Sequence, residues 1–419
     1  MSSPHIEAAI VRLCRQPRTF EFISQNLRGF DPVELIIFLD RLEKKEVLEH
    51  NRDLWTIKEI KSNLVMKLDS EDPQLYLKKY MGYFDFLKTP HPLDFEWRNS
   101  TSSLKMLIEE ILRLNFVSDK ILILGMPTLF ATACLKDIPQ HVTLVELNRP
   151  IARGLSKLNT EKKRFQIHEA DIFTVAPETI GKFNFVIMDP PWYSDHFYQF
   201  MWLAAQCLDI GGVLGVSLPP MNTRPNIPEE RVKWFKFCQD HGLCLESLVP
   251  EKLEYAMPFF EFNAFRAAGV ENIQPFWRKG DLAFFRKVKT SARKRPKFSR
   301  TSNLWTEKEI DTVRFRIKVD GPDAKGQFII SSILKGDILP TVSTRDTRRG
   351  EANIWTSGNR IFSVNQPKKL LFALESHHVQ NSKKEKNSVI PDFVKMVTDF
   401  EKKEYNNYLD WLYREMESN

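Results

Sequence analysis

Short apolar runs alternate with longer amphipathic stretches through the middle of the chain, from residue 101 to residue 288. The stretches between the runs, such as NRPIARGLSKLNTEKK and YSDHFYQFMWLAAQCLD, have the period and the length of helices. Alternation of this kind is typical of an α/β fold in which helices cover both faces of a parallel sheet. The predicted strands are KILIL (120–124), HVTLVE (141–146), RFQIHEA (164–170), FNFVIM (183–188), GVLGVS (212–217), LCLESLV (243–249) and DLAFFRKV (281–288).

Residues 1–65 have a different pattern, in which three helical segments precede a short hairpin. The hairpin VLEHNRDLWTI has Asn51-Arg52-Asp53 between two apolar runs, which indicates a two-stranded wing. Three helices and a wing predict a winged-helix domain. The third helix, DPVELIIFLDRLEKKE, carries five acidic residues against three basic ones. We therefore expect it to mediate a homodimer or to pack against the next domain, with DNA recognition as the alternative.

Three further segments complete the predicted organisation. Residues 66–100 are rich in aromatic residues and proline, and we interpret them as an ordered connector. Residues 289–303 are predicted to be a basic linker, since 289–300 contains six Lys or Arg; a strap for nucleic acid is the alternative. Residues 304–419 predict an α+β extension, in which a charged helix follows the β-like runs TVRFRIKV, GQFIISSIL, RIFSV and KKLLFAL.

Composition places few further limits on the chain, which has 419 residues, 42% of them hydrophobic and 27% charged. The longest apolar run, 121–135, is interrupted by Gly125 and Pro127 and is shorter than the roughly 20 residues that span a bilayer. Since no signal segment is evident either, we expect a cytoplasmic protein without a membrane partner. The net charge of +7 permits a phosphate-bearing partner. Five scattered cysteines without a Cys-x-x-Cys pair indicate no metal site.

The ends of the predicted strands carry the candidate chemistry, because ligands of such sheets bind beyond the carboxyl ends of the strands. Gly125 follows the first strand, where a ligand can approach the backbone closely; a simple tight turn is the alternative. Glu146 ends the second strand 21 residues later, a spacing at which an acid commonly accepts hydrogen bonds from ribose hydroxyls; a helix cap is the alternative. Asp171 and Ile172 follow the third strand and could flank an adenine ring. We predict these four residues as a cofactor site.

The fourth strand ends in Asp189-Pro190-Pro191-Trp192. An amino group that attacks an alkyl sulfonium sheds positive charge, and a carboxylate that accepts its N–H bond stabilises that charge. Two prolines make a rigid turn without N–H groups, so a carbonyl can take the second amino hydrogen. Trp192 or Tyr193 offers a flat surface to a planar base or an alkylammonium. The sequence therefore predicts a catalytic turn of Asp189, Pro190, Pro191 and Trp192, with Tyr193 at the substrate.

Two later regions supply candidate substrate contacts. Arg224 and Arg266 lie in the loops after the fifth and sixth strands, where a guanidinium can meet a phosphate or a carboxylate. Residues 343–360 combine Arg345, Arg348, Arg349 and Arg360 with Trp355. Charge next to a stacking surface is typical of contacts with single-stranded nucleic acid, whereas a solvated loop is the alternative.

The Asp-Pro-Pro-Trp turn resembles the [D/N/S]-P-P-[Y/F/W] motif of S-adenosylmethionine-dependent amino methyltransferases, and its tryptophan form resembles the messenger-RNA adenosine methyltransferases of eukaryotes. The resemblance implies a Rossmann-like, doubly wound sheet of the class I methyltransferase type over residues 101–288. It also implies that S-adenosylmethionine is the cofactor and that the acceptor is an exocyclic amino group.

Residues 1–290 as a whole resemble the branched-chain polyamine synthases, in which a winged helix precedes a Rossmann-like domain with an Asp-Pro-Pro turn. That resemblance implies decarboxylated S-adenosylmethionine as cofactor and transfer of an aminopropyl group to a polyamine. Met126-Pro127-Thr128 stands where that family has acids that would hold a cationic amine. A flat, neutral amino group fits this sequence better.

Three hypotheses follow. The first is an N-methyltransferase that acts on an exocyclic amino nitrogen, with adenine N6 of a nucleic acid as the foremost acceptor. The second is an aminopropyltransferase of the polyamine synthase type. The third is a catalytically silent module that binds nucleic acid or a protein partner, since the loop at Gly125 has one glycine where methyltransferases often carry three.

Overall fold

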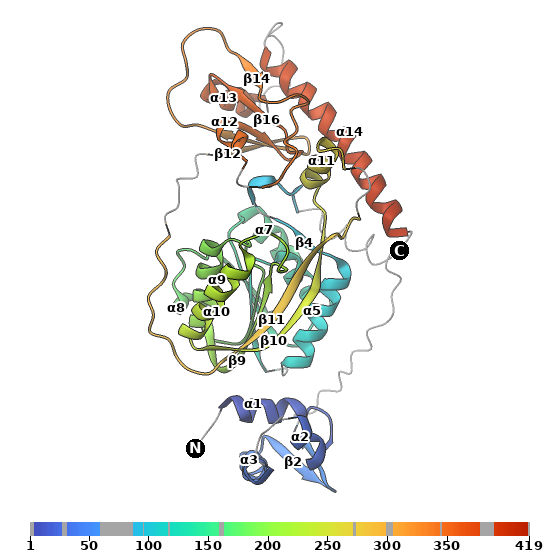
Figure 1. The fold of residues 1–419 in the computed structure, drawn as a ribbon, viewed down its shortest axis with the longest axis vertical. Coiled ribbons are helices and arrows are strands. Elements are labelled where there is room, and N and C mark those ends of the chain that lie inside the picture. Colours follow the sequence, from blue (N-terminus) through green and yellow to red (C-terminus); the bar gives the residue numbers. More distant parts are fainter. Residues whose placement is uncertain are drawn as a thin grey trace. The chain divides into compact units, whose positions relative to one another are not determined.

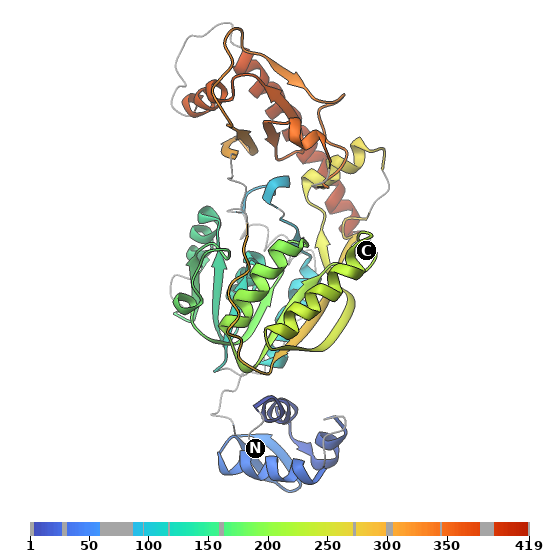
Figure 2. The ribbon, with the colours of Figure 1, turned by 60° about the vertical axis from the view of Figure 1, so that its left-hand side comes forward.

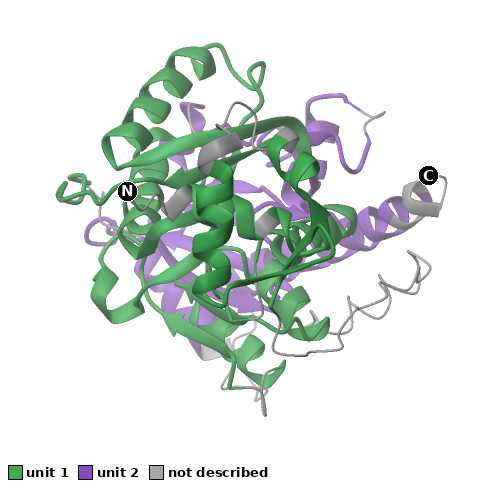
Figure 3. Ribbon diagram, turned by 90° about the horizontal axis from the view of Figure 1, so that it is seen from below, with its two compact units in different colours: residues 1–76, 101–253, 280–298 green, residues 77–100, 254–279, 299–419 purple. Residues whose placement is uncertain are grey.

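A computed structural model gives the arrangement of most of the chain. It describes residues 4–26, 32–58, 87–94, 96–115, 118–158, 163–270, 274–298, 305–343, 346–377 and 389–417. The chain divides into two compact units, each built from separated segments (Figure 3). The first comprises 1–76, 101–253 and 280–298, and the second comprises 77–100, 254–279 and 299–419. Among the described residues, no helix combines the length and the hydrophobicity that crossing a bilayer requires.

The N-terminal part of the first unit has three helices and a three-stranded antiparallel sheet of order β1-β3-β2. Arg52 and Asp53 both have positive φ angles, so the hairpin between β2 and β3 turns tightly where the sequence predicts a turn. Buried apolar side chains such as Ile10 and Leu35 join the helices to the sheet. The elements are α1 (Pro4–Leu13), β1 (Arg18–Thr19), α2 (Phe20–Asn26), α3 (Pro32–Lys44), β2 (Leu48–Asn51) and β3 (Leu54–Ile57).

The largest sheet has eight strands, in the order β4-β10-β11-β9-β8-β5-β6-β7 (Figure 1). Strands β5 to β9 are parallel to one another, but β11 runs antiparallel to β9. The sheet is therefore mixed, and the parallel arrangement that the sequence predicts holds for β5 to β9 but not for β11. The strands are β4 (Arg98–Asn99), β5 (Lys120–Leu124), β6 (His141–Glu146), β7 (Phe165–Glu169), β8 (Phe183–Met188), β9 (Leu208–Leu218), β10 (Leu243–Ala256) and β11 (Arg278–Lys287).

Helices cover this sheet in two layers (Figures 1 and 2). Helices α5, α6 and α7 pack together, and α8, α9 and α10 pack together. Right-handed crossovers place the two groups on opposite faces, since the chain moves in one direction from β5 to β7 and in the other from β8 to β9. The helices are α5 (Thr101–Leu114), α6 (Pro127–Leu135), α7 (Arg149–Leu158), α8 (Pro177–Ile180), α9 (Ser194–Cys207) and α10 (Ile227–Asp240).

The second unit contains a five-stranded antiparallel sheet of order β12-β13-β15-β16-β14. The apolar faces of two helices, α13 (Pro367–His377) and α14 (Val389–Glu417), cover it. The C-terminal part of α14 packs on α11 (Phe259–Ala267) through aromatic rings. The strands are β12 (Trp305–Ile310), β13 (Val313–Lys318), β14 (Ile330–Ser332), β15 (Ile354–Thr356) and β16 (Ile361–Val364), with the short helices η1 (Pro92–Asp94) and α12 (Arg348–Glu351) beside them.

The secondary structure of one segment in the second unit was predicted wrongly. The run KKLLFAL was expected to be β-like, but it lies within α13. Pro367 begins this helix, and Leu370 and Leu374 are buried at the i and i+4 positions of one face. A short apolar run fits both periods, and tertiary packing decides between them.

The two units also divide the chain differently from the predicted domains. Residues 254–279, expected in the Rossmann-like domain, belong to the second unit, and residues 289–298 of the expected linker belong to the first. The expected connector 66–100 lies outside the described residues as far as residue 86. Packing joins segments that are distant in the sequence, and a pattern that is read along the chain does not show such contacts.

Candidate functional site at the strand ends

The strand register brings the predicted cofactor and catalytic residues together at the carboxyl ends of neighbouring strands, which we call the edge of the large sheet. Leu124 pairs with Val145 on one side and with Met188 on the other. The residues that follow these positions are Gly125, Glu146 and Asp189, so Gly125 lies between the two acids. Neighbouring strands are about 4.8 Å apart. This edge is the topological switch point, because the chain leaves β5 toward β6 and leaves β8 toward β9.

Gly125 has a left-handed φ of 65°, a conformation that favours glycine. A β-carbon at this position would lie 3.3 Å from the Cε1 atom of Phe200, so the turn also has little room for a side chain. The N–H of Gly125 donates to the Val145 carbonyl at 3.2 Å. The glycine therefore provides close access to the sheet edge, and a hydrogen bond to a ligand has to come from a later N–H of the turn.

Glu146 is buried, and its Oε1 atom accepts the N–H of Asn148 at 2.7 Å. Asn148 in turn caps α7 by accepting the N–H of Ile151 at 3.3 Å. The capping role that was the alternative for Glu146 is thus present in part, since this carboxylate orders the turn before α7. One carboxylate oxygen can order a turn while the other meets a ribose, so both roles are compatible.

Asp171 lies next in the row, in the turn after β7. Its Oδ1 atom accepts the N–H of Phe173 at 2.9 Å, and its carbonyl accepts the N–H groups of Thr174 and Val175. Ile172 is buried in the core of the first unit. The turn is thus ordered by its own backbone and holds the Asp171 carboxylate at the edge of the sheet.

The predicted catalytic turn follows β8 directly. Asp189, Trp192 and Tyr193 are partly exposed, whereas Pro190 is buried. The N–H of Tyr193 donates to the Pro191 carbonyl at 2.7 Å, which closes the turn before α9 begins. An acid at the strand end, a rigid bend and two partly exposed rings therefore lie where the sequence predicts them.

Two indole N–H groups fix this turn. Trp192 donates to the Oγ atom of Ser217 at 3.3 Å, and Trp234 donates to the Oγ atom of Ser194 at 3.1 Å. Ser217 is buried near the end of β9, and it lies next to Asp189 because Met188 pairs with Val216. Sequence reasoning missed Ser217, although a polar residue at the end of a predicted strand was a signal that could have found it.

The loop after β9 lies against the catalytic turn. The guanidinium carbon of Arg224 is 5.6 Å from the centre of the Tyr193 ring, and the same side chain pairs with Glu230. Arg231, a buried residue that no sequence signal indicates, donates to the Pro219 carbonyl and to Asp281. Buried charges persist when they are paired and hydrogen-bonded, and this pair anchors the loop that carries Arg224.

The other three predicted substrate residues belong to the second unit. Arg266 is exposed on α11, and Arg348 pairs with Asp346 at 2.7 Å. Trp355 is only 1% exposed and packs in a core cluster, where its indole N–H donates to Asn359 at 3.0 Å. The prediction that Trp355 stacks on a substrate base was wrong, because the ring is buried in the core and a base cannot reach it. Arg345 lies outside the described residues.

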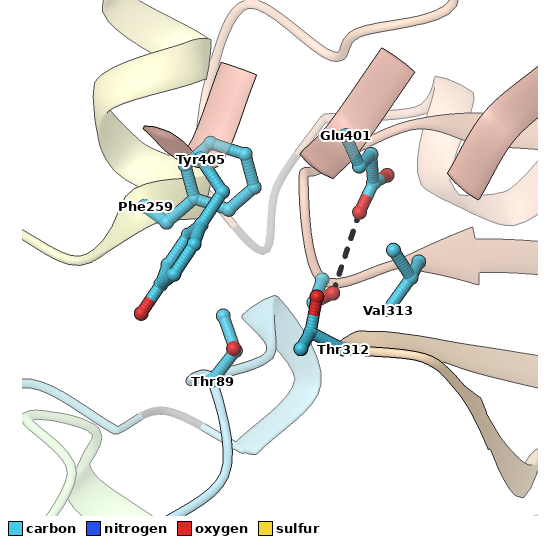
Figure 4. Close-up of a pocket in the computed structure, with 7 residues that line it drawn as sticks. Thr89, Phe259, Thr312, Val313, Glu401 and Tyr405 are labelled. Carbon is cyan, nitrogen blue, oxygen red and sulfur yellow. Dashed lines mark hydrogen bonds between the residues drawn. The ribbon is translucent and has the colours of Figure 1, made fainter. Parts of the chain in front are cut away.

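A second candidate site is a pocket in the second unit, which Figure 4 shows in close-up. Glu401 of α14 points into it and accepts the N–H of Gly358 at 2.9 Å and the hydroxyl of Ser357 at 3.3 Å. Burial raises the pKa of Glu401 to about 7, although the hydrogen bonds from Thr356 and Gly358 and the charge of Arg360 oppose the shift. The pocket is lined by Thr89, Phe259, Thr312, Val313, Ser357, Glu401 and Tyr405.

The pocket does not have the properties of an active site. It is too tight for a water molecule. A β-carbon on Gly358 would lie 2.5 Å from the Cδ atom of Glu401, so the absence of a side chain there is what lets the carboxylate reach the loop. Glu401 therefore attaches α14 to the loop after β15. Within the described residues, no group of three or more His, Cys, Asp or Glu could hold a metal ion.

Comparisons with known proteins find similarity in three-dimensional structure over part of this chain. No protein-family model and no curated protein sequence matches this chain. The branched-chain polyamine synthase from Thermus thermophilus, in complex with N4-aminopropylspermidine and 5'-methylthioadenosine, aligns with 70% of this chain and 89% of its own, at 13% identity and a TM-score of 0.45. A glycopeptide N-methyltransferase aligns with 44% of this chain and 89% of its own, at 14% identity and a TM-score of 0.31.

A TehB-like S-adenosylmethionine-dependent methyltransferase from Corynebacterium glutamicum aligns with 51% of this chain and 97% of its own, at 11% identity and a TM-score of 0.32. Similarities of this size concern the general fold. The functional argument therefore depends on the residues of this chain.

Proposed function

We propose that this chain transfers a methyl group from S-adenosylmethionine to an exocyclic amino nitrogen, and that the acceptor is adenine N6 of a nucleic acid. One observation carries the proposal: the register sets Asp189 beside Gly125, with Glu146 on the other side, at the switch point of the sheet. Ligands of doubly wound sheets bind at this point. The fold is of the Rossmann-like α/β type, which is compatible with the proposed activity.

The residues at this edge fit a nucleoside-bearing cofactor. Glu146 would accept hydrogen bonds from the ribose, and Asp171 and Ile172 would flank the adenine, while the bare backbone of Gly125 permits close approach. S-adenosylmethionine supplies a methyl group that its sulfonium already makes electrophilic.

The residues of the catalytic turn act on the acceptor. Asp189 accepts one N–H bond of the amino group and stabilises the positive charge that develops on it. The Pro191 carbonyl is engaged by Tyr193, so we assign the second amino hydrogen to the carbonyl of Pro190. Trp192, held by Ser217, supports the plane of the base. Alignment of the two reactants then supplies most of the rate. The nitrogen that gains the methyl group loses one proton to water, by way of Asp189, and a strong base is not needed.

A labelled-methyl assay against DNA, RNA, tRNA and a polyamine mixture, followed by nucleoside mass spectrometry, tests the proposal. Wild-type protein should label an amino nitrogen of a base. Asp189→Ala should lower transfer at least about hundredfold, because the developing charge loses its carboxylate. Calorimetry should show that this variant still binds S-adenosylmethionine within about threefold of wild type, since the cofactor residues are unchanged. Asp209→Ala, an exposed acid at the start of β9, is the matched control and should remain active.

Three outcomes would contradict the proposal. Undiminished turnover in Asp189→Ala would remove the mechanism. Transfer from decarboxylated S-adenosylmethionine to spermidine would identify an aminopropyltransferase instead. The absence of a binding heat with either sulfonium donor would indicate a silent binding module.

We also infer that the N-terminal elements form a winged helix that joins two copies of the chain. Its third helix, α3, exposes Ile36 and Ile37 by 50% and 46% of their surface, and exposed isoleucines on an acidic helix favour contact with protein over contact with nucleic acid. Light scattering that found only monomers at micromolar concentration would remove the homodimer.

A further inference from the structure

The segment 289–298 contains five Lys or Arg and no acidic residue. The sequence suggests a linker, but in the first unit this segment runs beside α9 as an extended chain (Figures 1 and 2). We refer to residues 289–298 as the strap. Its position and its charge call for separate explanations, because a connector needs neither.

Side chains of α9 hold the strap by its backbone. Gln206 donates to the Ser291 carbonyl at 3.3 Å, Trp202 to the Arg293 carbonyl at 2.9 Å, and Gln199 to the Pro296 carbonyl at 2.8 Å. Positions 199, 202 and 206 lie on one face of the helix. The strap is therefore fixed through three of its carbonyl groups along about two turns of α9.

The five basic side chains of the strap have three environments, and the first is that of Arg293, which pairs with Asp240 at 3.5 Å. Arg295 turns inward, donates to the Val175 carbonyl and lies 4.3 Å from the centre of the Trp202 ring. Three lysines, Lys289, Lys294 and Lys297, are exposed and have no ion-pair partner within the described residues. An extended chain rises about 3.3 Å per residue, so the last two are roughly 10 Å apart. The strap thus presents three exposed lysines, without ion-pair partners in the described part of the chain, on a fixed backbone.

The strap leads toward the catalytic edge. Its bonds to α9 run from residue 206 back to residue 199, toward the N-terminal end of the helix that follows the catalytic turn. There the centre of the Phe298 ring lies 4.5 Å from the centre of the Phe173 ring and 6.0 Å from that of His196. The ring centres of His196 and Tyr193 are 6.2 Å apart. All four rings are partly exposed. The row of charges therefore ends at aromatic surfaces beside the proposed acceptor site.

We infer that the strap is a track for single-stranded nucleic acid, in which its exposed lysines hold phosphates while a base enters the catalytic turn. This inference rests on the proposed function and names its substrate class. Positively charged tracks with aromatic rings are what single strands require for binding without sequence preference. A duplex hides the amino group of a paired base, and a polyamine, being a polycation, would be repelled by the strap.

Fluorescence anisotropy with labelled DNA and RNA oligonucleotides of about 12 nucleotides, without cofactor, tests the track. Lys294→Gln/Lys297→Gln should bind either oligonucleotide roughly tenfold more weakly at low salt. The slope of log affinity against log salt should fall by about 1.4, because each phosphate contact on a single strand contributes about 0.7. The control, Lys105→Gln/Lys157→Gln, removes two exposed lysines from α5 and α7 on the opposite face and should bind as wild type does.

Unchanged affinity in the strap variant, an equal loss in the control, or tighter binding of duplex than of single strand would overturn the track. Preference for RNA or for DNA would identify the natural strand. Thermal unfolding should be the same in wild type and both variants, since all four side chains are exposed.

Failure of the proposed function is separable from failure of the track. Binding that depends on the strap in a protein that methylates nothing would refute the enzyme and support the track. Methylation of a base with equal efficiency in wild type and the strap variant would support the enzyme and refute the track.

Discussion

Two loops of this protein have similar composition, but their aromatic rings differ in exposure to solvent. The proposed catalytic turn of the first unit carries Trp192 and Tyr193, and the loop around β15 in the second unit carries Trp355 among several arginines. Trp192 and Tyr193 stay partly exposed, whereas Trp355 is buried in a core cluster. The guanidinium carbon of Arg349 lies 4.4 Å from the centre of the Trp355 ring, so this contact between a charge and an aromatic ring contributes to the packing of the core.

The two carboxylates that matter in these units differ in the same way. Asp189 stands at the end of a parallel strand, where the sheet stops and a ligand can approach. Glu401 lies within a helix and is held by Ser357 and Gly358 of one loop. The difference teaches that residue type suggests chemistry, but the position at a sheet edge or in an interior decides whether the chemistry is available to a ligand.

A matched pair of tryptophan substitutions should give the largest contrast. Trp355→Ala should lower the free energy of unfolding of the second unit by about 3–5 kcal/mol, because the cavity is left in a packed core. Trp192→Ala should cost less than about 1 kcal/mol, since its ring is partly exposed, but it should impair transfer. Urea unfolding of both variants measures the contrast. Similar losses of stability would show that the two rings have similar roles.

The buried carboxylate should give the second effect, through pH. The folded pKa of Glu401 is about 7 and its ordinary value is 4.5. The folded state therefore holds a proton that the unfolded chain has already released. This contribution to stability is complete below pH 4.5 and is lost as the pH rises through 7, a change of about 3 kcal/mol.

Glu401→Gln should abolish that dependence, because the amide does not titrate. Unfolding should be measured from pH 5 to pH 8 as the difference between wild type and variant. The difference cancels other groups, such as His91, whose pKa burial lowers to about 3. Asp410→Asn, an exposed acid on the same helix, is the control and should leave the profile unchanged. Parallel profiles for wild type and Glu401→Gln would contradict a raised pKa.

The smallest effect should come from Ser217. Ser217→Ala removes the acceptor of the Trp192 N–H and should slow transfer about two- to tenfold, the value of one hydrogen bond. A role in positioning the ring requires that the same change has no further effect in a Trp192→Phe background. Additive losses in this double-mutant cycle would assign Ser217 another role.

Much of the first unit could be predicted from the sequence. Each strand end there carries a local signal, such as Gly125 after KILIL or Asp189 before two prolines, and the rule that ligands bind at the carboxyl ends needs no knowledge of packing. Ser217 was within reach of the same rule. Arg231 was not, because its function depends on Asp281, fifty residues away.

Alternation of short strands and helices along the chain determined the α/β class, and an Asp-Pro-Pro-Trp turn after a buried run determined which residues to test. Tertiary structure alone decided that β11 runs antiparallel, that KKLLFAL is a helix, that Trp355 is interior and that the strap lies along α9. The physical reason is the distance along the sequence over which each property is determined. Backbone periodicity is set by neighbours within a few residues, whereas burial and pairing depend on contacts between segments that only the folded chain brings together.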